Sequence, residues 1–174
     1  AGLQEIGINA FADCTALEAV DIPDSVTELR ESAFSGCGNL TRVTLPAGLE
    51  KIQDYLFFDC ERLQSIDLPA GVKEIESRAF RNCKSLTGIV WPQALQTIGS
   101  MAFDGCESLP AVILPDGVTE IGESAFSDCA GLTEVMIPDS VAEIGKWAFS
   151  DCGKLRNVSL PGSVKKIGSG AFWH

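Results

Sequence analysis

Residues 121–132, which read IGESAFSDCAGL, decide the fold because their pattern returns along the whole chain of 174 residues. The phenylalanine, the cysteine and a proline that follows them each recur every 23 residues. The phenylalanines are Phe11, Phe34, Phe57, Phe80, Phe103, Phe126, Phe149 and Phe172, and the prolines are Pro23, Pro46, Pro69, Pro92, Pro115, Pro138 and Pro161. Three residue types that share one period indicate a repeat architecture rather than an ordinary globular domain.

Each repeat begins with a short extended segment that ends at the proline. In residues 109–114 the apolar Val112 and Leu114 alternate with other residues, which is the periodicity of a β-strand. Pro115 cannot donate a hydrogen bond to a strand ladder, so the strand ends there. In residues 45–48 proline stands second and glycine fourth, which predicts a type I turn.

The second half of the repeat contains a shorter extended segment and a compact turn. Residues 118–121 read as a second strand, and residues 125–129 fit a single helical or 3-10 turn. The residue before each cysteine tolerates a left-handed backbone, so we expect a tight corner there. These corner residues are Asp13, Gly36, Asp59, Asn82, Gly105, Asp128 and Asp151.

One repeat is too small to bury its own apolar side chains, whereas stacked repeats can share a continuous interior. Neighbouring strands would then lie about 4.8 Å apart. We expect residues 1–174 to form a single domain of seven full repeats with partial copies at both ends. We also expect this domain to be a fragment of a larger protein.

The repeat resembles the BspA-type leucine-rich repeat, whose core is Ala-Phe-x-x-Cys-x-x-Leu. The resemblance covers essentially the whole chain, although Leu56 replaces the alanine in one copy and Trp91 replaces an aliphatic residue in another. It implies a leucine-rich repeat solenoid, mainly β with short helical turns, as a right-handed curved stack with a parallel sheet on its concave side. It also implies a cell-surface or secreted protein of the adhesin kind. No catalytic residue is associated with this repeat.

Composition narrows the classes of partner. The chain has 24 acidic and 13 basic residues and a net charge of −11, which disfavours nucleic acid and anionic membranes. The sequence contains no apolar run long enough to span a bilayer and no signal peptide, so direct membrane insertion is not expected. We expect no cofactor and no enzymatic activity.

The seven cysteines allow two explanations, which are disulfides and buried reduced thiols. They are Cys14, Cys37, Cys60, Cys83, Cys106, Cys129 and Cys152. Stacked residues have parallel Cβ vectors about 5 Å apart, whereas a disulfide needs about 3.8 Å between Cβ atoms. We therefore favour buried thiols. No two cysteines have zinc-ligand spacing and His174 is the only histidine, so no metal site is expected.

Three further patterns suggest ligands but have simpler explanations. The corner aspartates could form a calcium column, although Gly36, Asn82 and Gly105 interrupt it, so a backbone role is favoured. Tyr55 and Trp147 share one repeat position, but a glycan platform would need aromatic residues on adjacent coils. Trp91 replaces an inward residue and is expected in the core.

The best candidate for a binding surface is the row of strand residues that point outward. This row reads Asp21, Thr44, Asp67, Val90, Ile113, Met136 and Ser159. Its middle is apolar over three adjacent coils, which is typical of a contact surface. We predict a protein-binding site formed by Gly88, Val90, Ala111, Ile113, Glu134 and Met136. The alternative is that β-branched residues at these positions merely suit strands.

Two functions remain open at this point. The favoured one is an interaction module that binds a protein ligand through the concave sheet, with a host matrix protein or another microbial surface protein as its partner. The second is a passive stalk or spacer within a large surface protein. An enzyme is the least favoured class because no catalytic constellation is present.

Overall fold

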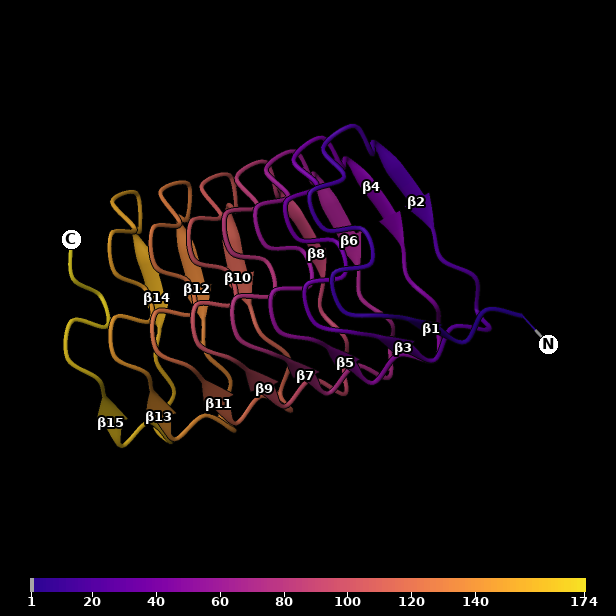
Figure 1. Ribbon diagram of the computed structural model, residues 1–174. Helices are drawn as coiled ribbons and strands as arrows, with labels where there is room; N and C mark the ends of the chain where they lie inside the picture. Colours follow the sequence, from indigo (N-terminus) through magenta and orange to yellow (C-terminus); the bar gives the residue numbers. More distant parts are fainter. Residues whose placement is uncertain (1) are drawn as a thin grey trace.

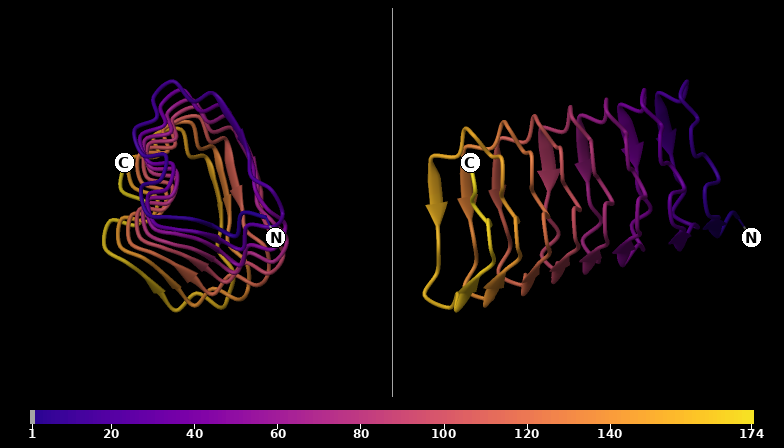
Figure 2. Two further views of the ribbon diagram at one scale, coloured as in Figure 1. Left: turned by 45° about the vertical axis from the view of Figure 1, so that its right-hand side comes forward. Right: turned by 60° about the vertical axis from the view of Figure 1, so that its left-hand side comes forward.

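A computed structural model describes residues 2–174 as a parallel β-solenoid in which each repeat forms one coil (Figure 1). Viewed along the stack, successive coils overlie one another around a shared interior (Figure 2). The solenoid expected from the repeat is therefore confirmed.

One side of each coil contributes a three-residue strand to a surface that we call the front sheet. Its strands are β2 (Ala19–Asp21), β4 (Arg42–Thr44), β6 (Ser65–Asp67), β8 (Gly88–Val90), β10 (Ala111–Ile113), β12 (Glu134–Met136) and β14 (Asn157–Ser159). All pairings are parallel and join β2 to β4, β6 to β8, and β10 through β12 to β14. The register places residues with the same repeat position side by side.

A second side contributes two-residue strands to a surface that we call the side sheet. Its strands are β1 (Glu5–Ile6), β3 (Glu28–Leu29), β5 (Lys51–Ile52), β7 (Glu74–Ile75), β9 (Thr97–Ile98), β11 (Glu120–Ile121), β13 (Glu143–Ile144) and β15 (Lys166–Ile167). The strands β5 to β15 pair in one continuous parallel series, and β1 pairs with β3.

The third side of each coil is made of turns, so the expected helical turn is wrong for the described residues. Between Ser124 and Asp128 the backbone N–H groups alternate between two kinds of acceptor. Ala125 and Ser127 donate to carbonyls three residues earlier, whereas Phe126 donates to Ala148 of the next coil at 2.8 Å. A helical turn would direct every N–H along its own axis, so it could not provide this ladder between coils.

The expected corners are confirmed, since every residue that precedes a repeat cysteine has a positive φ. The values run from 55° at Asp128 to 73° at Gly105. A second column of left-handed residues, which the sequence did not indicate, lies four positions earlier in each coil. It contains Asn9, Ser32, Tyr55, Arg78, Met101, Ser124, Trp147 and Gly170.

The turn that follows the strand differs by one residue from the prediction. Leu49 N–H donates to the Pro46 carbonyl at 3.3 Å, so the turn covers residues 46–49 and proline is its first residue. One coil earlier, Ile22 directly precedes Pro23, and its N–H still donates to the Thr44 carbonyl of the neighbouring coil. The ladder therefore continues up to the proline, and the turn can begin only there.

Repeated side chains fill the interior. The rings of Phe34, Phe57, Phe80, Phe103, Phe126 and Phe149 are all essentially inaccessible to solvent. Neighbouring rings in this column are stacked, with centroids 5.1–5.7 Å apart. Trp91 is half-buried and meets Phe103 edge to face at 5.4 Å, as expected for a core position.

Candidate protein-binding surface

The front sheet exposes an apolar patch that we define by Val90, Ile113 and Met136. In each strand the middle residue points into the core and the last residue points outward, so Val112 is fully buried while Ile113 is 51% exposed. Val90 and Met136 are 60% and 43% exposed. The register pairs Ile113 with Met136 directly, so these two side chains are cross-strand neighbours.

The residues predicted beside the patch lie on the same face. Gly88, Ala111 and Glu134 are the first residues of the strands that carry the patch, and each is half-buried. Ala111 pairs with Glu134 in the parallel register. The structure therefore brings together Ala111, Ile113, Glu134 and Met136 on paired strands, whereas Gly88 and Val90 lie on β8, which pairs with β6 and not with β10.

The N-terminal part of the same outward row is polar. Arg42 Nη1 and Thr44 Oγ1 each donate to Asp21 Oδ1 at 2.6 Å. The hydrogen bond from Arg42 is the largest of the causes that lower the pKa of the Asp21 carboxyl. These polar groups bind one another, whereas the apolar patch faces solvent.

A shallow depression adjoins the patch on its C-terminal side. It is lined by Ile113 and Met136 from the front sheet and by Asp116, Asp139 and Pro138 from the turns that follow the strands. The two aspartates hold equivalent positions in adjacent coils and are exposed. The sequence pattern did not single out these two residues, although their spacing of one repeat could have done so.

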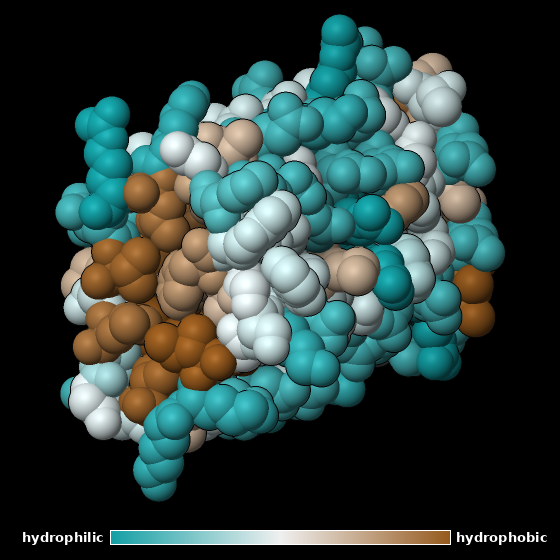
Figure 3. Space-filling view, turned by 90° about the vertical axis from the view of Figure 1, so that its left-hand side faces the viewer, coloured by the Kyte–Doolittle hydropathy of each residue, from teal (hydrophilic) through white to brown (hydrophobic). Residues whose placement is uncertain are grey.

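A second apolar surface lies at the C-terminal end of the stack, which Figure 3 faces. Val158, Leu160 and Ile167 are 39%, 46% and 47% exposed there. In earlier coils the residues at these repeat positions are covered by the next coil, as the 0% exposure of Val135 and Ile144 shows. This surface is uncovered interior, whereas the front-sheet patch consists of side chains that point outward.

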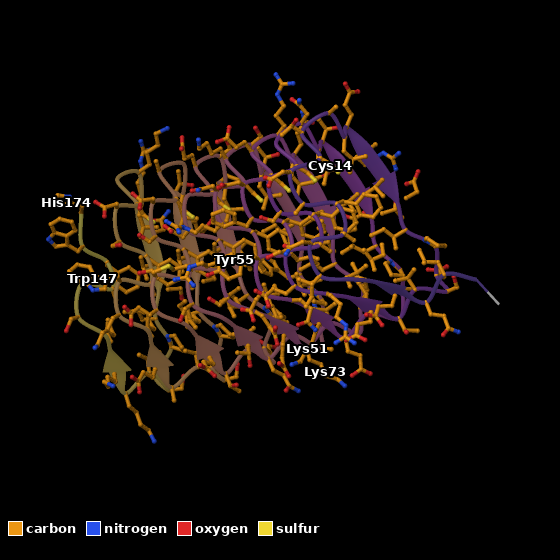
Figure 4. All side chains as sticks on the ribbon, viewed as in Figure 1. Cys14, Lys51, Tyr55, Lys73, Trp147 and His174 are labelled. Carbon is orange, nitrogen blue, oxygen red and sulfur yellow. The ribbon has the colours of Figure 1, made fainter. Side chains whose placement is uncertain are left out.

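The side sheet carries ion pairs between coils. Lys51 Nζ lies 2.8 Å from Glu74 and 3.0 Å from Glu76, and Lys73 Nζ lies 3.0 Å from Glu50. Figure 4 shows Lys51 and Lys73 near the surface on this side of the molecule. The pairs are exposed, so they hold side chains in place rather than form an acid–base pair for catalysis.

The shared position of Tyr55 and Trp147 does not form an aromatic platform. Arg78, in the coil between Tyr55 and Met101, donates from Nη1 to the Tyr55 hydroxyl at 2.8 Å. Its guanidinium also lies 5.4 Å from the centre of the Tyr55 ring. The tyrosine face is therefore covered by a side chain of the protein itself.

The cysteines are free, and six of the seven are buried. Burial raises their pKa values, to about 11 for Cys37 and about 12 for Cys152. Thiols with pKa values this high are poor nucleophiles at neutral pH. Among the described residues, no group of three or more His, Cys, Asp or Glu side chains could hold a metal ion.

Comparison with known proteins identifies the family. A family model described as a BspA type leucine-rich repeat region, in six copies, matches residues 1–92 and 73–174. The chain belongs to the BspA-type leucine-rich repeat family. Leucine-rich repeat proteins are generally protein-interaction modules, and the family is typically non-enzymatic. The comparison with curated proteins gave no match.

Solved structures of bacterial leucine-rich repeat proteins share the fold. The leucine-rich repeat protein of T. pallidum is 36% identical, with a TM-score of 0.68 over 95% of this chain and 67% of that one. A protein from Eubacterium ventriosum is 27% identical, with a TM-score of 0.76 over 90% of this chain and 42% of that one. A leucine-rich cell surface protein from Faecalibacterium prausnitzii is 26% identical, with a TM-score of 0.50 over 98% and 61%. The chain thus spans about two thirds of the first protein and less of the others.

No helix among the described residues has the length and apolar character needed to cross a bilayer.

Proposed function

We propose that this BspA-type domain binds a protein ligand through the front sheet, at the patch formed by Val90, Ile113 and Met136. The observation that carries the proposal is the outward exposure of large apolar side chains on three successive coils, of which Ile113 and Met136 are paired across β10 and β12. Burial of such side chains against a partner would release about 25 cal/mol for each Å² of apolar surface. Isolated exposed apolar residues are common in soluble proteins, but a contiguous group favours a contact site.

The setting that fits this function is the cell surface or the secreted fraction of a bacterium. The neighbour from Faecalibacterium prausnitzii is described as a cell surface protein. In this setting the partner would be a host matrix protein or a surface protein of another microbe. A high negative charge would keep the domain soluble and would direct it towards partners with basic surfaces.

The test compares patch variants with a matched control in binding to a panel of purified host matrix and microbial surface proteins. We expect Ile113→Asp and Met136→Lys to raise the Kd for the bound protein by about tenfold or more, as substitutions at the centre of an interface do. The control is Ile8→Asp, because Ile8 is 63% exposed and lies on the turn side of the first coil, where the equivalent positions of later coils hold Asp54 and Glu123. Its Kd should equal that of the parent.

Two outcomes would contradict the proposal. If the patch variants bind as tightly as the parent, the contact lies elsewhere on the molecule. If no protein in the panel is bound by the parent, a passive spacer becomes the better account. Circular dichroism should give the same spectrum for every variant, because the substituted side chains point to solvent.

A further inference from the structure

The depression beside the apolar patch joins apolar and acidic surface in one place. Ile113 and Met136 line it from the front sheet, and Asp116 and Asp139 line it from the turns that follow these strands. The aspartates are one repeat apart in adjacent coils, so their backbones are separated by about 5 Å, the spacing of neighbouring strands. A ligand here would meet hydrocarbon and negative charge side by side.

Both carboxylates are free to take a ligand. Among the described residues, neither Asp116 nor Asp139 forms an ion pair or accepts a hydrogen bond within the chain. The residue at the same repeat position in an earlier coil, Asp24, accepts a hydrogen bond from the Ala47 N–H at 3.0 Å. The aspartates of the depression therefore lack the internal partner that their counterpart has.

The acidic surroundings extend around the patch. Asp67 pairs with Val90 in the register of the front sheet, and Glu134 pairs with Ala111. Neither acid forms an ion pair among residues 2–174. A partner that covers Ile113 and Met136 would therefore contact unpaired acidic residues at the margin of the interface. This favours a partner segment that is basic over one that is neutral or acidic.

We propose that this depression binds an arginine or lysine side chain of the protein partner, with the apolar stem across Ile113 and Met136 and the cation between Asp116 and Asp139. Long basic side chains bury their methylene groups on apolar surface while the charged end stays with polar groups. Arginine fits better than lysine because its planar guanidinium offers several donors in a fixed fork. This inference rests on the proposed function and adds the chemistry of the partner.

A metal ion is the less suitable occupant of the same place. Calcium takes six to eight oxygen ligands, and the depression offers two carboxylates. The described residues contain no group of three potential ligands anywhere. A cation that brings its own apolar stem uses both halves of the depression, whereas a bare ion would use only one.

The experiment uses a blocked heptapeptide with a central arginine flanked by leucines, and a second peptide in which citrulline replaces the arginine. Citrulline keeps the shape of arginine and removes its charge. Binding to the full chain is followed by the shifts of the backbone amide signals in ¹H–¹⁵N NMR spectra. We expect the arginine peptide to shift the amides of Ile113, Asp116, Met136 and Asp139, and to bind roughly fivefold more tightly than the citrulline peptide.

A pair of double variants separates the depression from the general acidity of the protein. Asp116→Asn with Asp139→Asn should weaken the arginine peptide by roughly fivefold, because two partly exposed ion pairs are lost. Glu107→Gln with Glu123→Gln removes the same charge from exposed positions outside the depression and should change the Kd by less than about twofold. Equal effects of the two double variants, or equal binding of the two peptides, would overturn the inference.

These experiments distinguish a failure of this inference from a failure of the proposed function. If Ile113→Asp abolishes binding of a whole protein partner while the arginine and citrulline peptides behave alike, the patch binds protein without a basic side chain. In that case this inference fails and the proposed function stands. If the peptide shifts map to the acidic N-terminal coils around Asp13 and Glu18, binding is nonspecific and the inference again fails.

Discussion

At the scale of single residues, the repeat cysteine has a role that the sequence could not reveal. The Cys106 Sγ lies 3.2 Å from the carbonyl oxygen of Phe80 in the preceding coil, and the other buried cysteines contact the equivalent carbonyl at 3.1–3.3 Å. A thiol is small, apolar and a weak donor, so it fills the interior and also satisfies this acceptor. The sequence predicted buried thiols but not their hydrogen bonds.

The buried thiols make the fold sensitive to high pH. Burial raises their pKa values above the ordinary value of 9.0, so they remain protonated in the folded chain when the unfolded chain loses its thiol protons. The stabilisation is complete below pH 9 and is lost as the pH rises, by up to about 1.4 kcal/mol per pH unit for each thiol. Denaturant titrations between about pH 9 and 10.5 should show this slope. Cys106→Ala should reduce this slope by the contribution of one thiol. An unchanged slope would contradict the conclusion that the buried thiols cause the pH dependence.

Backbone conformation and space both favour glycine over alanine at the Gly105 corner. Gly105 has a φ of 73°, and a Cβ there would lie 2.5 Å from Asn82 Oδ1. Gly105→Ala should therefore lower the free energy of unfolding by about 1–2 kcal/mol, as measured by urea titration. The control is Gly153→Ala, since no atom lies within 4 Å of a Cβ there. If both alanines are tolerated equally, the corners are not strained.

Only one of the two left-handed columns could be predicted from residue types. Aspartate, asparagine and glycine occupy the corner before each cysteine, and these residues adopt positive φ at low cost. The other column includes Tyr55, Arg78 and Trp147, which carry no such preference. There the ladder between coils sets the backbone, because Trp147 N–H donates to Ser169 of the next coil at 3.0 Å. Tertiary hydrogen bonding outweighs local preference at this position.

At the scale of elements, the phenylalanine column stabilises each coil against the next. The Phe103 ring lies 5.1 Å from Phe80 and 5.2 Å from Phe126, and it is fully buried. Phe103→Ala should lower the free energy of unfolding by about 3–5 kcal/mol, because a cavity forms and two stacking contacts are lost. Urea or thermal unfolding measures the change. A loss below about 1 kcal/mol would show that the ring does not hold the two coils together.

The strands were predictable as elements because alternation and proline mark them, whereas the turn side was not. A run such as Ala125–Cys129 has the composition of a helical turn, and only the neighbouring coil shows that the N–H groups of Phe126 and Asp128 donate to carbonyls of the next coil. Gly99 and Gly122, which share one repeat position, illustrate the same limit. A Cβ at Gly122 would lie 2.6 Å from the backbone of Gly99, although φ is ordinary at both. Close packing of coils, absent from any single repeat, explains these glycines.

At the scale of the whole molecule, the stack and the outward row could be predicted from the 23-residue period, because the register aligns equivalent residues of successive repeats. The apolar patch was predictable for that reason, since Ile113 and Met136 differ by one repeat. The depression was not, because it combines strand residues with Asp116 and Asp139 from the following turns. Its shape depends on how the turns fold back against the sheet, which no periodicity in the sequence describes.

A stack in which each coil contacts only its neighbours should lose a terminal coil without losing its fold. Deletion of residues 152–174 removes one repeat and should leave the front-sheet patch intact, because Met136 lies on an earlier coil. The urea m-value follows the surface exposed on unfolding, so it should fall by about one eighth, the fraction of the chain removed. The free energy of unfolding should fall too, while a cooperative transition persists. Complete loss of structure in the shortened chain would show that stability is not divided among neighbouring coils, and that the last coil is needed by all the others.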